Sequence, residues 1–394
     1  MKIFKEITYS AAIKIVSISI AFFAPMIVVR VYSLSEYGVF NYIMSLLVYI
    51  SIVQSGVTPS LRNNLARVED PSDAKDMYIS ALSQTTILVV ILTLIYLIIS
   101  IFINQLLSVF LFFFVSLLSL YGPVVSTYKD YKDESVSYRL SELFFQLIAF
   151  AVFALAASHG MNVFILASIF ISYRFIYPLF VSRKDFLVSV YRLFDNGGFR
   201  YAVFNVADYT YVLMQSLSVL MVVGINTYAF NLFGSSGFGV YSTYYRFFFF
   251  PMQVFSFIAP IIWIRYAQST SAKTIRSELG LVSSVIFMAF FLWSILMYFF
   301  SSDVVALYMG SDNKSPLSIL TFCFFYLSFQ VSDFLSVRLN AKSIYLPQVY
   351  MMALTLLLIG WCWLSGYDFE YFVLVISAIR FLFLFYSSYL AFRR

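Results

Sequence analysis

The feature that most constrains this chain is a succession of apolar segments, each about as long as a bilayer is thick. A helix that crosses the hydrocarbon core needs about 20 mostly apolar residues. Twelve segments meet that length: 10–32, 37–60, 79–102, 105–126, 140–158, 161–182, 205–228, 238–264, 279–300, 317–337, 348–366 and 369–391. They do not alternate between polar and apolar residues as the strands of a membrane barrel do. Only 11% of the residues are charged, against about 25% in a soluble domain. The sequence therefore predicts an all-α polytopic membrane protein with about twelve transmembrane helices.

Basic residues are distributed unevenly over the segments that connect these spans. With the N-terminus inside, 19 of the 25 Lys and Arg residues fall on inside segments and only Lys314 falls on an outside connector. The other five lie within spans. Cytoplasmic loops of membrane proteins carry such an excess of Lys and Arg. The pattern predicts an even number of spans, with both termini in the cytoplasm.

The connector 183–200 lies midway along the chain and contains Gly197 and Gly198. Because glycine has wide backbone freedom, we expect this connector to be a flexible cytoplasmic linker. It separates an N-terminal six-helix bundle, 1–182, from a C-terminal six-helix bundle, 201–394.

The two predicted bundles share a short sequence signature. The segment 36–42 (EYGVFNY) follows the first span, and 237–243 (GFGVYST) follows the seventh, with Gly38 and Gly239 in matching positions. Both halves begin inside, so they form a parallel repeat. Parallel repeats are related by an axis along the membrane normal. We therefore expect two parallel six-helix bundles around a central cavity.

The chain also resembles a known family, the Wzx-type O-antigen and polysaccharide repeat-unit flippases, which are related to multidrug and toxin extrusion transporters. The resemblance is carried by short motifs in each half, supported by the length, the twelve spans and the duplicated halves. The motifs are Arg30, Glu36-Tyr37-Gly38-Val39-Phe40, Gly56, Arg62-Asn63-Asn64 and Phe238-Gly239-Val240-Tyr241.

The resemblance implies a transport function in the bacterial inner membrane. The expected substrate is an undecaprenyl-pyrophosphate-linked oligosaccharide repeat unit, moved from the cytoplasmic to the periplasmic leaflet during lipopolysaccharide or other polysaccharide biosynthesis. The expected partners are this lipid-linked oligosaccharide, the surrounding membrane lipids, and the polysaccharide polymerase with its chain-length regulator.

Charged residues inside the predicted spans are the candidate functional residues. A charge at mid-bilayer costs about 2.5–3.5 kcal/mol on insertion scales, so it generally faces a cavity or a partner. The candidates for a substrate cavity are Arg246, Arg380, Arg174 and Arg30. Guanidinium groups bind pyrophosphate oxygens in pairs and keep their charge. Two alternatives stay open: Arg174 or Arg380 pairs with an aspartate to hold helices together, and Arg30 reaches the headgroups.

Two aspartates and a proline complete the candidate residues. Asp208 and Asp333, toward the inner ends of their spans, are candidates for proton relay or for ion pairing. Pro25 removes a backbone hydrogen bond within the first span, where a kink would serve gating or static shape.

Several other classes of protein are excluded or disfavoured. The single histidine, His159, leaves no set of residues for a multi-histidine metal site or a Ser-His-Asp triad, and there is no Walker motif for ATP. We expect no enzyme activity, no cofactor and no metal. The net charge of +6 is scattered between spans, which fits lipid rather than nucleic acid. Two alternatives remain: a membrane O-antigen polymerase, disfavoured by short outside connectors, and a drug or ion exporter.

Overall fold

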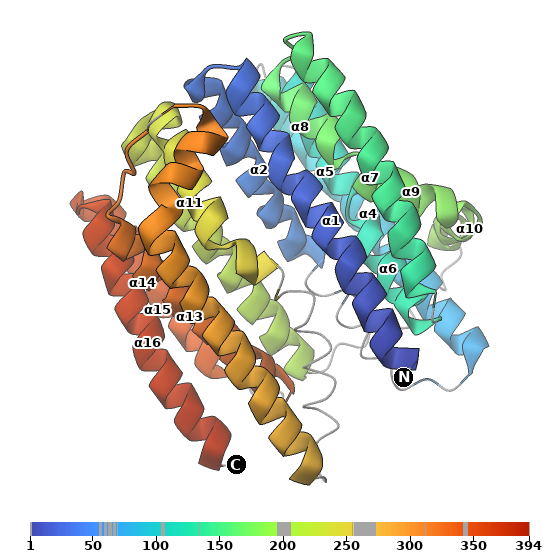
Figure 1. Cartoon of the computed structure of the whole chain (residues 1–394). Coiled ribbons are helices and arrows are strands. Elements are labelled where there is room, and N and C mark those ends of the chain that lie inside the picture. Colours follow the sequence, from blue (N-terminus) through green and yellow to red (C-terminus); the bar gives the residue numbers. More distant parts are fainter. Residues whose placement is uncertain are drawn as a thin grey trace. The chain divides into compact units, whose positions relative to one another are not determined.

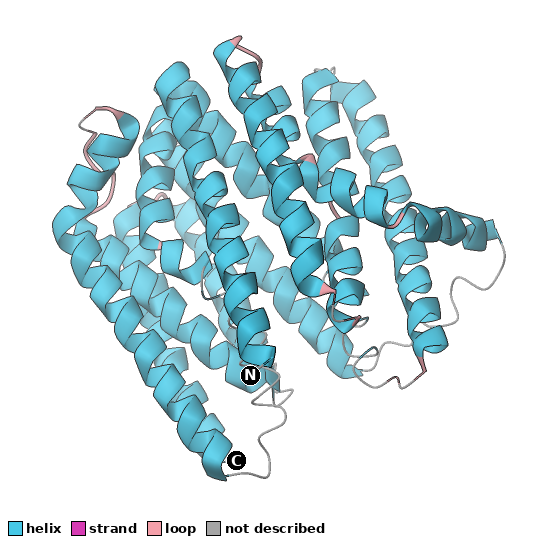
Figure 2. Cartoon of the chain, turned by 45° about the vertical axis from the view of Figure 1, so that its right-hand side comes forward, coloured by secondary structure: helices cyan, strands magenta, loops and turns pink. Residues whose placement is uncertain are grey.

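The structure is a computed structural model of the chain, and it describes residues 2–54, 57, 58, 61, 65, 68, 70–103, 107–132, 134–194, 206–253, 255, 273–311, 313–341 and 346–393. Within these ranges several stretches are described for their backbone alone, among them 2–11, 206–209, 273–283 and 334–341. The described residues are mostly helical, with short loops and turns between the helices, and contain no strand (Figures 1 and 2). They divide into two compact units: unit 1 comprises 1–32 and 43–216, and unit 2 comprises 33–42 and 217–394.

Unit 1 is built from apolar helices, and two of the predicted spans are each divided into two helices. Its helices are α1 (Lys2–Val31), most of α2 (Leu34–Gln54), α4 (Pro71–Ile103), α5 (Leu107–Leu118), α6 (Tyr121–Tyr131), α7 (Ser135–Ser158), α8 (Val163–Ile171), α9 (Tyr173–Val181), α10 (Arg183–Phe194) and the start of α11 (Val206–Phe248). The predicted span 105–126 is formed by α5 and α6, and 161–182 is formed by α8 and α9.

In the core of unit 1, tyrosines and aliphatic side chains of α4, α6 and α9 pack together. The rings of Tyr78 and Tyr128 stack with centroids 4.0 Å apart, and the Tyr78 hydroxyl donates to Ser182 Oγ at 2.9 Å. At Gly122 a Cβ would lie 2.9 Å from the carbonyl oxygen of Arg174, so α6 and α9 pack closely only because this residue has no side chain. The bond between Tyr78 and Ser182 pairs two polar groups inside the bundle, as a bilayer favours.

Unit 2 contains the rest of α11 together with α13 (Lys273–Met309), α14 (Ile319–Ala341), α15 (Leu346–Ser365) and α16 (Phe369–Arg393). α11 is kinked at Gly234, which has φ 66° and ψ 177°. That left-handed backbone favours glycine. The kink joins the predicted spans 205–228 and 238–264, of which the second is described only as far as residue 255.

The prediction of an all-α membrane fold is confirmed. Seven helices of the described residues are long and apolar enough to cross a membrane, and the segments 15–31 and 319–333 are shorter apolar helices. Large apolar side chains lie on the surface, among them Phe144 on α7 and Phe299 on α13, which are 61% and 68% exposed. A water-soluble surface would not leave so many of them uncovered, whereas acyl chains match them.

The division of the chain differs from the predicted one in two places. The predicted linker 183–200 begins as the helix α10, which packs within unit 1, because Ser189 contacts α4 and Phe186 contacts Tyr121 of α6. The remaining linker residues, 195–200, lie outside the described residues. Residues 33–42, predicted to belong to the N-terminal bundle, are part of unit 2. The cause is a close contact between the two copies of the repeat.

The two repeat segments cross at their glycines within unit 2. A Cβ on Gly38 would meet the carbonyl oxygen of Ser235, and a Cβ on Gly239 would meet the carbonyl oxygen of Leu34. Gly38 and Gly239 are equivalent in the repeat, and so are Leu34 and Ser235. The hydroxyls of Ser35 and Ser235 lie 2.6 Å apart at the same crossing. The contact is therefore reciprocal, as expected where a twofold axis relates the copies.

Candidate functional site

Arg246 is a half-buried arginine in the second half of α11, and neutral oxygen atoms hold its guanidinium. One Nη donates to the hydroxyl of Tyr308 on α13 at 3.0 Å, and the other donates to Asn41 Oδ1 on α2 at 2.7 Å. Tyr37, whose hydroxyl lies 2.8 Å from Thr243 Oγ1, is a third neighbour. We call these five residues the Arg246 cluster. Its members come from two helices of the repeat crossing and from α13.

The Arg246 cluster carries a positive charge that its own side chains do not offset. Among the residues described, no carboxylate forms a salt bridge with Arg246. A guanidinium has five N–H donors, and the bonds to Tyr308 and Asn41 leave others for a further acceptor. The amide nitrogen of Asn41 is also buried without a partner. Such an arrangement suits an anion that accepts several hydrogen bonds at once.

Arg380 is fully buried, and its environment differs from that of Arg246. Only 1% of its surface is exposed, and its guanidinium carbon lies 3.3 Å from the ring centroid of Phe329 on α14. One Nη donates to Ser332 Oγ at 2.6 Å and lies 3.8 Å from Asp333 Oδ1. Asp333 is 33% exposed. The Arg380–Asp333 pair therefore joins α16 to α14 inside unit 2 and offsets most of the buried charge.

The other candidate arginines lie in unit 1 and are exposed. Arg174, on α9, donates from Nε to the hydroxyl of Tyr173 at 3.3 Å. Arg30 lies in the last turn of α1. The structure therefore does not bring these two arginines together with Arg246 or Arg380 within one compact unit. Their role toward a substrate stays a prediction.

The remaining candidates are placed only in part. The backbone of Asp208 is in α11, but its side chain lies outside the described residues. Pro25 is buried inside α1, which continues through it to Val31. Its gating role stays a prediction.

The sequence missed the neutral partners of both arginines. Asn41 and Tyr37 belong to the repeat signature, so the motif itself was a signal. Tyr308 and Phe329 carried no signal, because each is one aromatic residue among 46 Phe and 31 Tyr. Only the fold distinguishes the few that contact a guanidinium.

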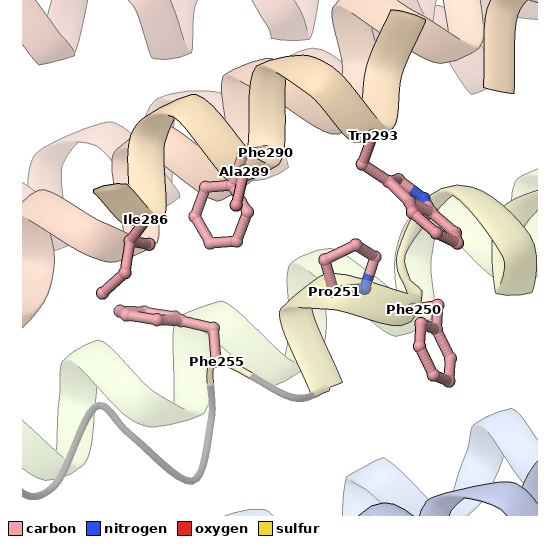
Figure 3. A pocket seen from close by; sticks show the side chains of 7 residues that line it. All are labelled: Phe250, Pro251, Phe255, Ile286, Ala289, Phe290 and Trp293. Carbon is pink, nitrogen blue, oxygen red and sulfur yellow. The ribbon is translucent and has the colours of Figure 1, made fainter. Parts of the chain in front are cut away.

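An apolar pocket of about 260 Å³ lies in unit 2, next to the end of α11 (Figure 3). Phe250 and Pro251 line one side, and α13 contributes Trp293 and Phe290. The indole N–H of Trp293 donates to the carbonyl oxygen of Phe247 at 3.0 Å, so it does not point into the pocket as a free donor. The pocket suits a hydrocarbon group and not a charged ligand. In the described part of the chain, no three His, Cys, Asp or Glu residues lie close enough to hold a metal ion.

Comparison with known proteins shows which fold positions these residues. No protein-family model matches the sequence, and no curated protein matches it. Solved structures do. An inward-facing multidrug resistance transporter of the MATE family, in the MOP superfamily, has a TM-score of 0.68 at 12% identity and covers 97% of this chain and 98% of its own. A mutant of the Vibrio cholerae MATE transporter VcmN has a TM-score of 0.61 at 13% identity, covering 99% and 95%. The bent form of VcmN has 0.53 at 12%, covering 99% and 96%. The chain therefore has the polytopic membrane fold of MATE transporters over its whole length.

Proposed function

We propose that this chain is a flippase in the bacterial inner membrane, with both termini in the cytoplasm. It translocates an undecaprenyl-pyrophosphate-linked repeat unit of O-antigen or a related polysaccharide from the cytoplasmic to the periplasmic leaflet. The observation that carries the proposal is Arg246, a guanidinium whose hydrogen-bond partners among the described residues are neutral oxygens, within a MATE-like fold.

A pyrophosphate crossing the membrane needs a charge partner in a region of low dielectric constant. Burying an unpaired anion costs several kcal/mol, and a fixed guanidinium offsets that cost with paired, charge-assisted hydrogen bonds. Asn41 and Tyr308 hold Arg246 from two sides, so little side-chain freedom is lost when an anion binds.

The proposed cycle is alternating access, in which the sugar and pyrophosphate pass through the protein while the polyprenyl tail stays in lipid. This needs no covalent step, so the protein is not an enzyme and uses no cofactor. The polymerase and the chain-length regulator that receive the repeat unit are the proposed partners in the membrane.

A drug exporter is the second candidate, because one of the structures similar to this chain is a multidrug resistance transporter of the MATE family. A cationic drug needs a carboxylate that is free to bind it. Within the residues described, the intramembrane carboxylate Asp333 already faces Arg380, whereas Arg246 has no carboxylate. This charge distribution favours the anionic substrate.

The test is deletion of the gene in its host. We expect lipid-linked single repeat units to accumulate in the cytoplasmic leaflet and surface polysaccharide to disappear. In complementation, Arg246→Ala should restore little export, whereas Arg246→Lys should restore part of it because the charge remains but the planar fork is lost.

The matched control is Arg139→Ala, which removes an arginine paired with Asp130 outside the Arg246 cluster. This variant should export normally. Protein abundance in the membrane is measured for every variant. Normal surface polysaccharide in the deletion strain, in a host with no second flippase, would overturn the proposal. Drug sensitivity of that strain with intact polysaccharide would instead favour the exporter.

A further inference from the structure

The helix α10 begins immediately after a membrane span. The last span of the N-terminal half ends with α9 at Val181, and only Ser182 separates it from Arg183, the first residue of α10. In Figures 1 and 2, α10 runs across the direction of the other helices of unit 1. A helix that starts where a span ends and turns across it lies at the level of the lipid headgroups.

One face of α10 is fixed on unit 1. Ser189 is buried, and its carbonyl oxygen accepts a hydrogen bond from Ser83 Oγ at 2.9 Å. Phe186 packs edge-on against Tyr121, with ring centroids 5.2 Å apart. Arg192 donates to Asp76 Oδ1 on α4 at 2.6 Å. These contacts determine which face of α10 points away from the protein.

The outward face of α10 is apolar. Leu187, Val188 and Tyr191 are 68%, 43% and 73% exposed. With Lys184 they follow the spacing i, i+3, i+4 and i+7, which places all four on one side of a helix. A helix at a membrane surface buries such a face at the boundary between headgroups and acyl chains.

The charges on α10 complement an anionic surface. Asp185 faces Lys75 at 3.7 Å, and Arg192 is paired with Asp76, so these groups offset one another. Arg183 and Lys184 are exposed and form no salt bridge with any carboxylate that the structure describes. The unbalanced charge at the start of α10 is therefore positive, and it lies beside the exposed apolar face.

We propose that α10 is an interfacial lipid-binding helix: Arg183 and Lys184 bind the headgroups of anionic phospholipid, while Leu187, Val188 and Tyr191 enter the acyl region beneath them. The site recognises the membrane and not the transported molecule, so it does not depend on the proposed function. Each basic residue near an anionic surface contributes to binding, and long side chains reach the phosphates while their stems stay apolar.

Probe depth tests the insertion. The full chain, with Cys323 and Cys362 replaced by alanine, receives a single cysteine at Leu187 or Tyr191 and an environment-sensitive nitrobenzoxadiazole label, and is placed in lipid nanodiscs. Both positions should give blue-shifted emission, quenching by nitroxide-labelled lipid and protection from aqueous iodide. A label at exposed Asp73, in the first turn of α4, should give the opposite result. Iodide quenching at 187 and 191 equal to that at 73 would overturn the insertion.

Lipid selectivity tests the charge. Nanodiscs of phosphatidylcholine with phosphatidylglycerol carry a trace of either lipid with a spin label, and the motionally restricted fraction is measured for each. The parent protein should restrict more phosphatidylglycerol than phosphatidylcholine, and the Arg183→Gln/Lys184→Gln variant should lose most of that preference. Arg139→Gln, which removes a paired arginine, should keep it. An unchanged preference in the double variant would overturn the headgroup assignment.

Discussion

Replacing Gly38 with alanine tests the repeat crossing directly. The new Cβ would lie 1.7 Å from the carbonyl oxygen of Ser235 and 2.6 Å from its carbonyl carbon. Ordinary contacts of a Cβ begin at about twice the first distance. The obstructing atoms are backbone, so rotating a side chain cannot relieve the clash. The variant must separate the first turns of α2 from the segment that follows Gly234.

The cost follows from what that separation breaks. Overpacking alone costs about 1–3 kcal/mol. The crossing also holds the Ser35–Ser235 hydrogen bond at 2.6 Å and the bond from Arg246 to Asn41 at 2.7 Å. A neutral hydrogen bond contributes about 1 kcal/mol and one to a charged group about 1.5–3 kcal/mol. We therefore expect Gly38→Ala to lower the free energy of unfolding by about 3 kcal/mol or more, combining these ranges.

Thermal unfolding in detergent, followed by the loss of monomeric protein on size exclusion, measures the effect. Gly239→Ala should cost less, since its nearest atoms would be 3.1 and 3.2 Å away. Gly360→Ala, with nothing within 4 Å, and Gly224→Ala, with isoleucine carbons at 3.5 Å, are matched controls within helices. They should be neutral or stabilising, because alanine favours helix. If Gly38→Ala melts with the controls, the close crossing is refuted.

Three further results are expected. In the Ser35→Cys/Ser235→Cys variant, oxidation should form a disulfide that raises the thermal unfolding temperature until it is reduced, because the two hydroxyls lie 2.6 Å apart at a crossing within unit 2; failure of the disulfide to form would contradict the crossing. In a thermal unfolding assay, Asp333→Asn should destabilise unit 2 more than Arg380→Met, since it leaves the fully buried charge of Arg380 unpaired. The double variant should recover part of the loss. Equal effects of the two single variants would contradict the role of the pair. Glu134 lies between spans, and a hydrogen bond from a nearby lysine lowers its pKa. Its contribution to the free energy of unfolding is therefore fully present above the ordinary glutamate pKa and is lost as the pH falls through the lowered value. The difference in stability between the parent protein and Glu134→Gln should vanish in acid.

The spans were predictable because their signal is additive over about twenty residues. Breaks inside the spans were not. Ser119 and Leu120 interrupt the helix between α5 and α6, and Ser172 interrupts it between α8 and α9, without a change in apolar content. Hydropathy therefore cannot locate them. The helical start of the linker was not predictable for a related reason: residues 183–194 form α10, and its partners in unit 1 are supplied only by the fold, whereas the glycines at 197 and 198 lie outside the described residues.

The candidate site was predictable as a list of charges but not as a set of contacts. Arg246 and Asn41 are 205 positions apart, and no local pattern links them. Each of the two residues nevertheless lies in or just after one copy of the repeat signature. The crossing of the two copies at their glycines therefore accompanies the contact between Arg246 and Asn41. For Arg380, the sequence left open an aspartate partner, and the geometry selects Asp333, one turn from Phe329 on the same face of α14.

Arg246 and Arg380 of unit 2 differ in burial and in charge partners, and this difference favours a structural role for Arg380 and the proposed anion-binding role for Arg246. Arg380 is nearly inaccessible, has an aromatic ring against its face and has a carboxylate opposite, so an entering anion would have to displace Asp333. Arg246 is more accessible, and the described residues that hold it are neutral oxygen acceptors that cannot take its charge. An anion would add the missing charge to Arg246 without breaking an existing pair. Substrate selectivity should therefore respond to Arg246 and to the neutral groups Asn41 and Tyr308, whereas stability should respond to Arg380.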